Sequence, residues 1–444
     1  MHSTDITGSS ATLSLSPKHV LLSEVLSVTS MMRRNSRWAL STPSYPSRDP
    51  ALASSLGLRI SKIAPNTYHS GRGNTEQELM AGFQDLKRLV KDIEDVHSLP
   101  LSTLLSPFLA IIRSSLSTGP ITSTALTALH NFFLCGLFSP ASVSLQATLA
   151  ELSSSLSSCK FEASDSSGDE VVLLKIMTVI SDAMCGSIGR TLGDIEICEM
   201  LETVLTTSCQ MRLSEILRRS AEGTLHQLVR TVFARLHELD PEAEEQKVAD
   251  VDDSEGGEMK MSVSTTGPVV QSQETSPPGE QDGSIPEGNE VQAPEESVPP
   301  EQLEERQPET PSAPRIPYGL PSILELLRVL INILDPNDQA HTDSTRLTAL
   351  RTLNVALEAT GARICAYPSL SALILDHGCK FLFQLARSDH PVVLQSSLRA
   401  ITTMFETMRP KLKLQHELFL AFTIDRLTPA PITKEFDSEP EGVG

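Results

Sequence analysis

The sequence is poor in aromatic residues, which make up 4% of 444 positions and include a single tryptophan. It also lacks convincing runs of alternating polar and apolar residues, the pattern that half-buried β-strands require. Apolar residues instead recur at spacings of three and four, as at Leu21, Val25, Val28 and Met32. The spacing predicts an all-α protein.

Long apolar runs and paired cysteines are missing as well. No run approaches the ~18 apolar residues of a membrane-spanning helix, and the polar N-terminus has no apolar core of the kind that a signal peptide needs. We therefore expect any membrane contact to be peripheral. The seven cysteines are odd in number and include no CxxC pair, which favours reduced, buried thiols in an intracellular, cytoplasmic protein.

Positive charge is scarce: 36 Lys and Arg face 56 Asp and Glu, for a net charge of −20. This balance argues against nucleic-acid binding, which usually needs a basic face. The acids concentrate in residues 241–315, where 19 Asp and Glu face 4 Lys and Arg and where 11 of the 29 prolines lie. Such a segment cannot bury enough apolar surface to offset its ordering entropy, so a disordered acidic linker is predicted there.

Helical periodicity flanks this linker on both sides, which predicts two domains at residues 15–240 and 316–430 and a tail at 431–444. Antiparallel helices with short turns and no fixed repeat are typical of armadillo- or HEAT-like stacks. Helices are expected at 101–116, from 119, and at 142–158, 170–185, 194–211, 214–239, 322–334, 344–360, 369–386, 391–408 and 413–427.

Catalytic, cofactor and metal motifs are also absent. The sequence contains no HExxH, no Cys/His cluster of zinc spacing, no GxSxG and no GxxxxGK[ST]. His130, within ALTALHNFF, is expected to be a satisfied core or boundary residue. We therefore assign no catalytic, cofactor-binding or metal-binding residue and predict no cofactor, although a site that motifs cannot reveal stays open as a third hypothesis.

An acidic cluster in CKFEASDSSGDEVVLLKI allows three interpretations: a calcium loop, a catalytic acid pair or a helix start. Asp165, Ser167 and Asp169 alternate as calcium ligands would, but the sixth position is Glu170 instead of Gly and the twelfth is Ile176. Adjacent acids on a helix point in different directions. The helix start is favoured, with acids facing the positive end of the dipole and one face buried by Val171, Leu174, Thr178 and Val179.

A basic cluster ends the first predicted helix, with Arg33, Arg34 and Arg37 beside Trp38. The arginines complement the negative end of that helix, while Trp38 packs into a groove. The alternative is that they contact acidic lipid head groups or a partner.

Six segments together resemble the N-terminal half of the large Arf guanine-nucleotide exchange factors of the Golgi brefeldin A-resistance class (GBF, Gea and GNOM type). They are SMMRRNSRWA at 30–39, TGPITSTALTALHNFF at 118–133, FEASDSSGDEVVLLKI at 161–176, MRLSEILRRSAEGTLHQLVRTVFARL at 211–236, RTLNVALEATG at 351–361 and SLRAITTMFETMRPKLKLQHELFL at 397–420. The resemblance implies a dimerisation and cyclophilin-binding (DCB) domain, then a homology-upstream (HUS) domain. The exchange domain that follows in that family is not matched, and the HUS-like part is expected to be truncated.

The same resemblance implies that Asn131 and Glu170 belong to a self-association surface, although the family often has Lys where Asn131 stands. It further implies a non-catalytic homodimer that acts in Golgi vesicle-mediated transport, with an Arf- or Rab-family small GTPase as partner, peripheral on Golgi membranes. The alternative is a stand-alone helical-repeat adaptor that binds a small GTPase or a trafficking partner.

The proline content and like-charge repulsion of residues 241–315 lead to a first test. Limited proteolysis should cut between Pro241 and Arg315 and release two helical fragments. Protection of the whole segment would contradict the linker prediction.

Overall fold

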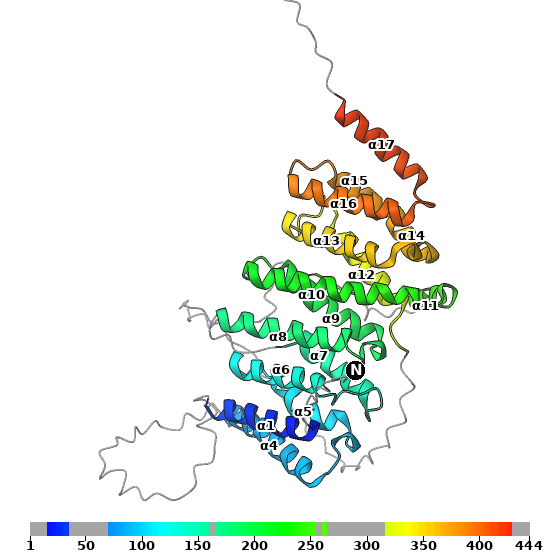
Figure 1. The fold of residues 1–444 in the computed structure, drawn as a ribbon. Coiled ribbons are helices and arrows are strands. Elements are labelled where there is room, and N and C mark those ends of the chain that lie inside the picture. Colours follow the sequence, from blue (N-terminus) through cyan, green and yellow to red (C-terminus); the bar gives the residue numbers. More distant parts are fainter. Residues whose placement is uncertain (1–15, 35–69, 160–165, 254–259, 264–315, 429–444) are drawn as a thin grey trace, which may run out of the picture.

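A computed structural model describes residues 16–34, 70–159, 166–253, 260–263 and 316–428, and within these ranges all regular secondary structure is helical. The helices stack in two layers (Figure 1). One layer holds α1 (Pro17–Arg34), α6 (Gly119–Leu134), α8 (Ser166–Cys185), α10 (Glu215–Ala234), α13 (Asp343–Thr360) and α16 (Pro391–Met408). The prediction of an all-α protein is confirmed for the described residues.

The second layer holds α4 (Ser70–Asp92), α5 (Leu101–Arg113), α7 (Leu145–Ser157), α9 (Asp194–Cys209), α12 (Leu320–Ile333), α14 (Pro368–Leu373) and α15 (Cys379–Leu385). Each helix contacts mainly the next helix of its own layer and its partner across the layers, so the stack extends in one direction. Helix α17 (Lys413–Leu427) lies at the far end, turned away from the stack (Figure 1).

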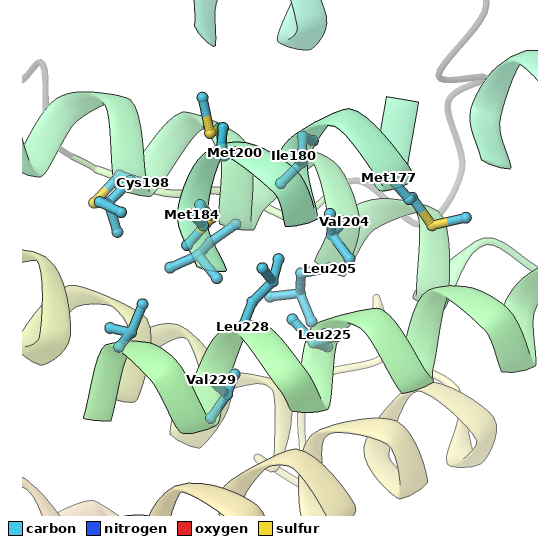
Figure 2. Close-up of a cluster of buried hydrophobic side chains, with 14 of the residues drawn as sticks. Met177, Ile180, Met184, Cys198, Met200, Val204, Leu205, Leu225, Leu228 and Val229 are labelled. Carbon is cyan, nitrogen blue, oxygen red and sulfur yellow. The ribbon is translucent and has the colours of Figure 1, made fainter. Parts of the chain in front are cut away.

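The core is a continuous apolar seam between the two layers. At one end, the rings of Phe83, Phe108 and Phe132 meet edge to face, with centroids 5.0 and 5.1 Å apart, and join α4, α5 and α6. In the middle, side chains from α8, α9 and α10 fill the space between the layers (Figure 2), among them Met177, Ile180, Met184, Cys198, Met200, Val204, Leu205, Leu225, Leu228 and Val229. The predicted stripe on α1 is buried.

Two predicted helices have different boundaries in the structure. The spacing of Leu79, Phe83, Leu86, Val90, Ile93 and Val96 predicts a helix that reaches Val96, but α4 ends at Asp92, and Val96 begins a short 3₁₀ turn capped by Asp95. The helix predicted at 369–386 is divided by a π-helical turn at Ile374–Gly378, where i→i+5 hydrogen bonds widen the helix.

The linker boundary at residue 241 is wrong, because α11 (Pro241–Asp253) is helical. Pro241 suits a first turn, and Glu242 and Glu244 in that turn face the positive end of the helix dipole. Residues 264–315, the main part of the predicted linker, lie outside the described residues. Their disorder stays a prediction.

The helices on either side of the predicted linker stack directly on each other. At the start of α12, Asp194 Oδ1 accepts hydrogen bonds from the Gly319 and Ser322 amides at 3.0 and 3.2 Å. The buried carboxylate of Glu244 accepts another from the Leu320 amide at 2.8 Å. These acids satisfy N–H groups that have no partner within their own helix.

The same junction satisfies carbonyls just beyond the end of α10. The buried Tyr367 hydroxyl donates to the Leu236 and Leu239 carbonyls, at 2.7 and 3.2 Å, and the Arg363 guanidinium donates to both as well. Residues 316–428 therefore stack directly on the preceding helices.

The junction changes the expected result of the proteolysis test. Once the segment between the described parts is cut, the two fragments should still elute together on size exclusion, because α12 and α13 bury apolar surface against α9 and α10. Separate elution of the wild-type fragments would contradict the junction.

The Tyr367→Phe substitution removes a buried donor and should lower the free energy of unfolding by about 1–2 kcal/mol. The control is Thr402→Val, because the Thr402 hydroxyl donates to Leu398 O within its own helix.

Candidate interaction site

The outward surface of α8 carries apolar side chains that no other described residue covers fully. The face predicted to be buried by Val171 and Leu174 is in part the wrong one, because Val171 is 44% exposed and Leu174 is 42% exposed. Val179 is buried as predicted, and the other buried side chains of this helix are Val172, Leu173, Ile176, Met177, Ile180, Ala183 and Met184. The run VVLLKIM contains apolar residues at every position except Lys175. Apolar side chains therefore remain on the outward face of the helix after its inward face has filled the core.

Helix α6 lies beside α8 in the same layer and extends this surface. Leu134, at its last turn, is 70% exposed, and the half-buried Thr124 and Thr127 line the same side. We call the outward side of these two helices, formed by Thr124, Thr127, Leu134, Val171, Leu174 and Thr178, the α6/α8 face.

The two helices run parallel, as shown by the polar contacts between them. Lys175 Nζ donates to Thr127 Oγ1 at 2.6 Å and to Ser123 O at 3.2 Å, and burial lowers the pKa of Lys175. Further along, His130 Nδ1 lies 2.6 Å from Asp182 Oδ2. His130 is thus a satisfied boundary residue, as predicted.

Asn131 and Glu170 sit at opposite ends of the α6/α8 face. Asn131 is beside His130, at the level of Asp182, whereas Glu170 lies near the start of α8, directly after its first turn. At about 1.5 Å per residue, roughly 18 Å of helix separates the two levels. The structure does not bring the two residues together within one copy of the chain.

Each of these two residues already has a partner within the chain. Asn131 Nδ2 donates to Glu24 Oε1 at 2.9 Å, which links α6 to α1. Glu170 accepts from the Ser214 amide at 2.7 Å and from the Ser214 hydroxyl at 2.5 Å. Ser214 is the N-cap of α10, and its hydroxyl also accepts from the Leu217 amide.

Glu170 therefore supports the start of the next helix in its layer, in addition to lying at the start of its own. The helix-start interpretation of the acidic cluster gave Glu170 a capping role on α8, whereas the hydrogen bonds that the structure shows for its carboxylate go to the start of α10. Ser214 lies 44 residues away, and no local pattern in the sequence indicates the pairing. The first cluster members, up to residue 165, lie outside the described residues.

The remaining predicted contact residues are only partly described. Arg33 and Arg34 are exposed in the last turn of α1, where their charge complements the helix dipole. Arg37 and Trp38 lie outside the described residues. Whether the arginines contact lipid stays a prediction.

The cysteine thiols do not form an activated cluster. All seven are free; Cys159, Cys198, Cys209 and Cys379 are buried and the other three are half-buried. Burial raises the pKa of Cys159 to about 12 and that of Cys209 to about 11. Both thiols are therefore protonated near neutral pH. Among the described residues, no group of three or more His, Cys, Asp and Glu side chains is arranged to hold a metal ion.

A second apolar surface lies at the far end of the stack. Helix α17 has no buried residue, and Leu414, Leu418, Ile424 and Leu427 are exposed on it. A cavity of about 940 Å³ separates α17 from α16 and is lined in part by Ile401, Phe405, His416 and Phe419. Within the described residues, no helix is both long enough and apolar enough to span a bilayer.

Comparison with known proteins matches residues 319–438 to the HUS domain of the Mon2/Sec7/BIG1-like family. The chain is 32% identical over 425 residues to an uncharacterised protein of Schizosaccharomyces pombe, covering 93% of this chain and 26% of that one. It is 26% identical to ARF guanine-nucleotide exchange factor 2 of Saccharomyces cerevisiae, covering 92% of this chain and 29% of that one.

A third relative is the Golgi-specific brefeldin A-resistance guanine nucleotide exchange factor 1 homolog of Caenorhabditis elegans, 27% identical, with 82% of this chain and 22% of that protein covered. The chain thus spans less than a third of the length of each of these three relatives.

Proposed function

We propose that this chain is a non-catalytic region that self-associates and recruits an exchange factor to Golgi membranes. The proposal rests on two findings. The chain is homologous, over about 90% of its length, to the N-terminal part of Arf guanine-nucleotide exchange factors of the GBF, Gea and GNOM class, and it contains a HUS domain. The match of nearly the whole chain to only the N-terminal part of larger exchange factors is the observation that supports this function most strongly. An Arf- or Rab-family GTPase is the proposed partner.

The α6/α8 face is the proposed self-association surface. Its apolar residues lie among hydroxyl-bearing ones, and charged residues are depleted in the centres of stable protein interfaces. A two-fold axis lying in the plane of this face, halfway between Asn131 and Glu170, brings Asn131 of each copy opposite Glu170 of the other. An amide carries two N–H donors, and Glu24 uses one of them, so Asn131 can also donate to a carboxylate of the second copy.

Leu174→Asp tests this surface directly. The substitution places a charge at the centre of an apolar contact and should convert a dimer into a monomer at concentrations of about ten micromolar, because burying an unpaired carboxylate is costly. Light scattering measures the mass. Ile216→Asp is the matched control: it introduces the same charge on α10, at a position that is 84% exposed and outside the α6/α8 face.

A monomeric wild-type chain would contradict self-association, and a dimer that survives Leu174→Asp would contradict this face. Glu170→Lys is a less informative variant, because it also removes both hydrogen bonds to Ser214 and weakens the contact between α8 and α10.

The membrane part of the proposal involves Arg33, Arg34 and Arg37. Exposed arginines near a bilayer are attracted to anionic head groups. We propose peripheral contact with the cytoplasmic side of Golgi membranes, supported by the word Golgi-specific in the name of the Caenorhabditis elegans relative. The alternative adaptor function uses the same helical stack but needs no exchange factor.

The non-catalytic part of the proposal predicts that the chain does not accelerate GDP release from an Arf protein. Exchange by this family uses an acidic finger in a preformed groove. Three acids of this chain instead accept hydrogen bonds at helix starts: Glu170 at the start of α10, and Asp194 and Glu244 at the start of α12. A fluorescent-nucleotide assay on membranes, with and without the chain, measures the rate. Release above the spontaneous rate would contradict the proposal.

A further inference from the structure

A short segment of the predicted linker is seated on the stack. Residues 260–263 (KMSV) have no helical hydrogen bonding and lie across α9 and α12 of the second layer. Met261 is 7% exposed and belongs to the apolar core, and Val263 is half-buried against it. Lys260 and Ser262 between and beside them are exposed. This alternation is that of an extended peptide with one side against a surface.

Polar contacts hold the segment at the point where residues 316–428 stack on the preceding helices. The Met261 amide donates to Glu325 Oε1 at 3.1 Å. The Glu325 carboxylate is itself buried and accepts from Arg328 Nη1 at 2.6 Å. The Ser262 hydroxyl donates to Glu202 Oε1 of α9 at 3.2 Å. One segment therefore contacts a helix on each side of the junction.

The surroundings of Ser262 are acidic. Glu202 and Glu325 contact the segment, and both, with Glu199, lie close enough to the buried Cys198 thiol to raise its pKa, although burial is the larger cause. Burial raises the pKa of Glu202, and Glu199 raises it further, while hydrogen bonds from Ser262 oppose the shift. The cation among these contacts, Arg328, is already paired with Glu325, so an additional negative charge beside Glu202 meets mainly carboxylates.

We propose that the surface of α9 and α12 that contacts residues 260–263 is a docking site for an extended peptide with apolar residues on either side of a serine, that residues 260–263 occupy it within the same chain, and that phosphorylation of Ser262 releases them. The exposed hydroxyl is accessible to a serine kinase. Its oxygen bonds to the γ-phosphorus of ATP, ADP leaves, and the hydroxyl proton passes to the base of the kinase. The product carries close to two negative charges at neutral pH.

Release follows because the phosphate cannot donate to Glu202 as the hydroxyl does and is repelled by the carboxylates around it. The vacated docking site then accepts a peptide from another chain that likewise has apolar residues on either side of a serine. This inference does not depend on the proposed role in Arf activation, since it rests only on the contacts of residues 260–263.

The test uses the full chain and a fluorescently labelled peptide of residues 256–267. In the wild-type chain, the tethered segment competes at an effective concentration in the millimolar range. The Met261→Asp substitution should release residues 260–263 from the docking site. Fluorescence anisotropy should therefore show the peptide binding this variant at least tenfold more tightly than the wild type. Met261→Ser is a second, milder variant, and equal melting temperatures verify that both are folded.

Two further peptides test the switch. Phosphate on Ser262 should weaken binding to the Met261→Asp chain at least tenfold, whereas phosphate on Thr266, with the same added charge, should weaken it less than threefold. Failure of the unmodified peptide to bind either variant would overturn the docking site. Equal binding to wild type and variants would overturn occupancy by the chain's own segment. Equal loss from the two phosphates would overturn the role of Ser262.

Discussion

The stack depends on how helix ends are satisfied where α12 and α13 meet α9 and α10. Helix α12 begins with amides that have no partner in their own helix, and Asp194 and Glu244 from preceding helices accept their hydrogen bonds. Beyond the end of α10, the Leu236 and Leu239 carbonyls accept from Tyr367 and Arg363 instead of from water. The bonds of the Leu320 amide and the Leu236 carbonyl are buried, so leaving either of these two groups unpaired would cost about 1–3 kcal/mol. The long intervening segment therefore leaves the helical stack uninterrupted.

Contacts of this kind explain which parts of the fold could be predicted from the sequence. Helices are local, and spacings of three and four located nearly all of them within a few residues. The junction joins residues more than 120 positions apart, such as Tyr367 and Leu236, so no local pattern indicates it. Helix α11 was missed because the whole acidic, proline-rich region was treated as one segment, although its first residues carry a favourable Pro241 and two first-turn acids. The π-helical turn after Leu373 also has no signal in apolar spacing.

The candidate site was predicted less well, for a related reason. Periodicity identifies a buried face only when the rest of the helix is polar, and α8 carries apolar residues on its outward face as well. Val171 and Leu174 were therefore assigned to the core, whereas Val172 and Leu173 occupy it. The resemblance to a known family points to α6 and α8, but it could not show that Glu170 is bonded to Ser214 or that Asn131 is bonded to Glu24.

The double use of Glu170 has a physical consequence for self-association. Its carboxylate accepts two hydrogen bonds from Ser214, and these also fix the first turn of α10. A second copy that donates to the same carboxylate would compete with Ser214 or add to it, and either change acts on the contact between α8 and α10. Because each helix of the stack packs mainly on its neighbours, α10 lies between α8 and α13 and next to the junction that Tyr367 and Arg363 complete. Helix α10 packs against α8 of the α6/α8 face and against α9, whose Glu202 contacts Ser262, so the start of α10 that Glu170 fixes belongs to the packing on which both surfaces are built.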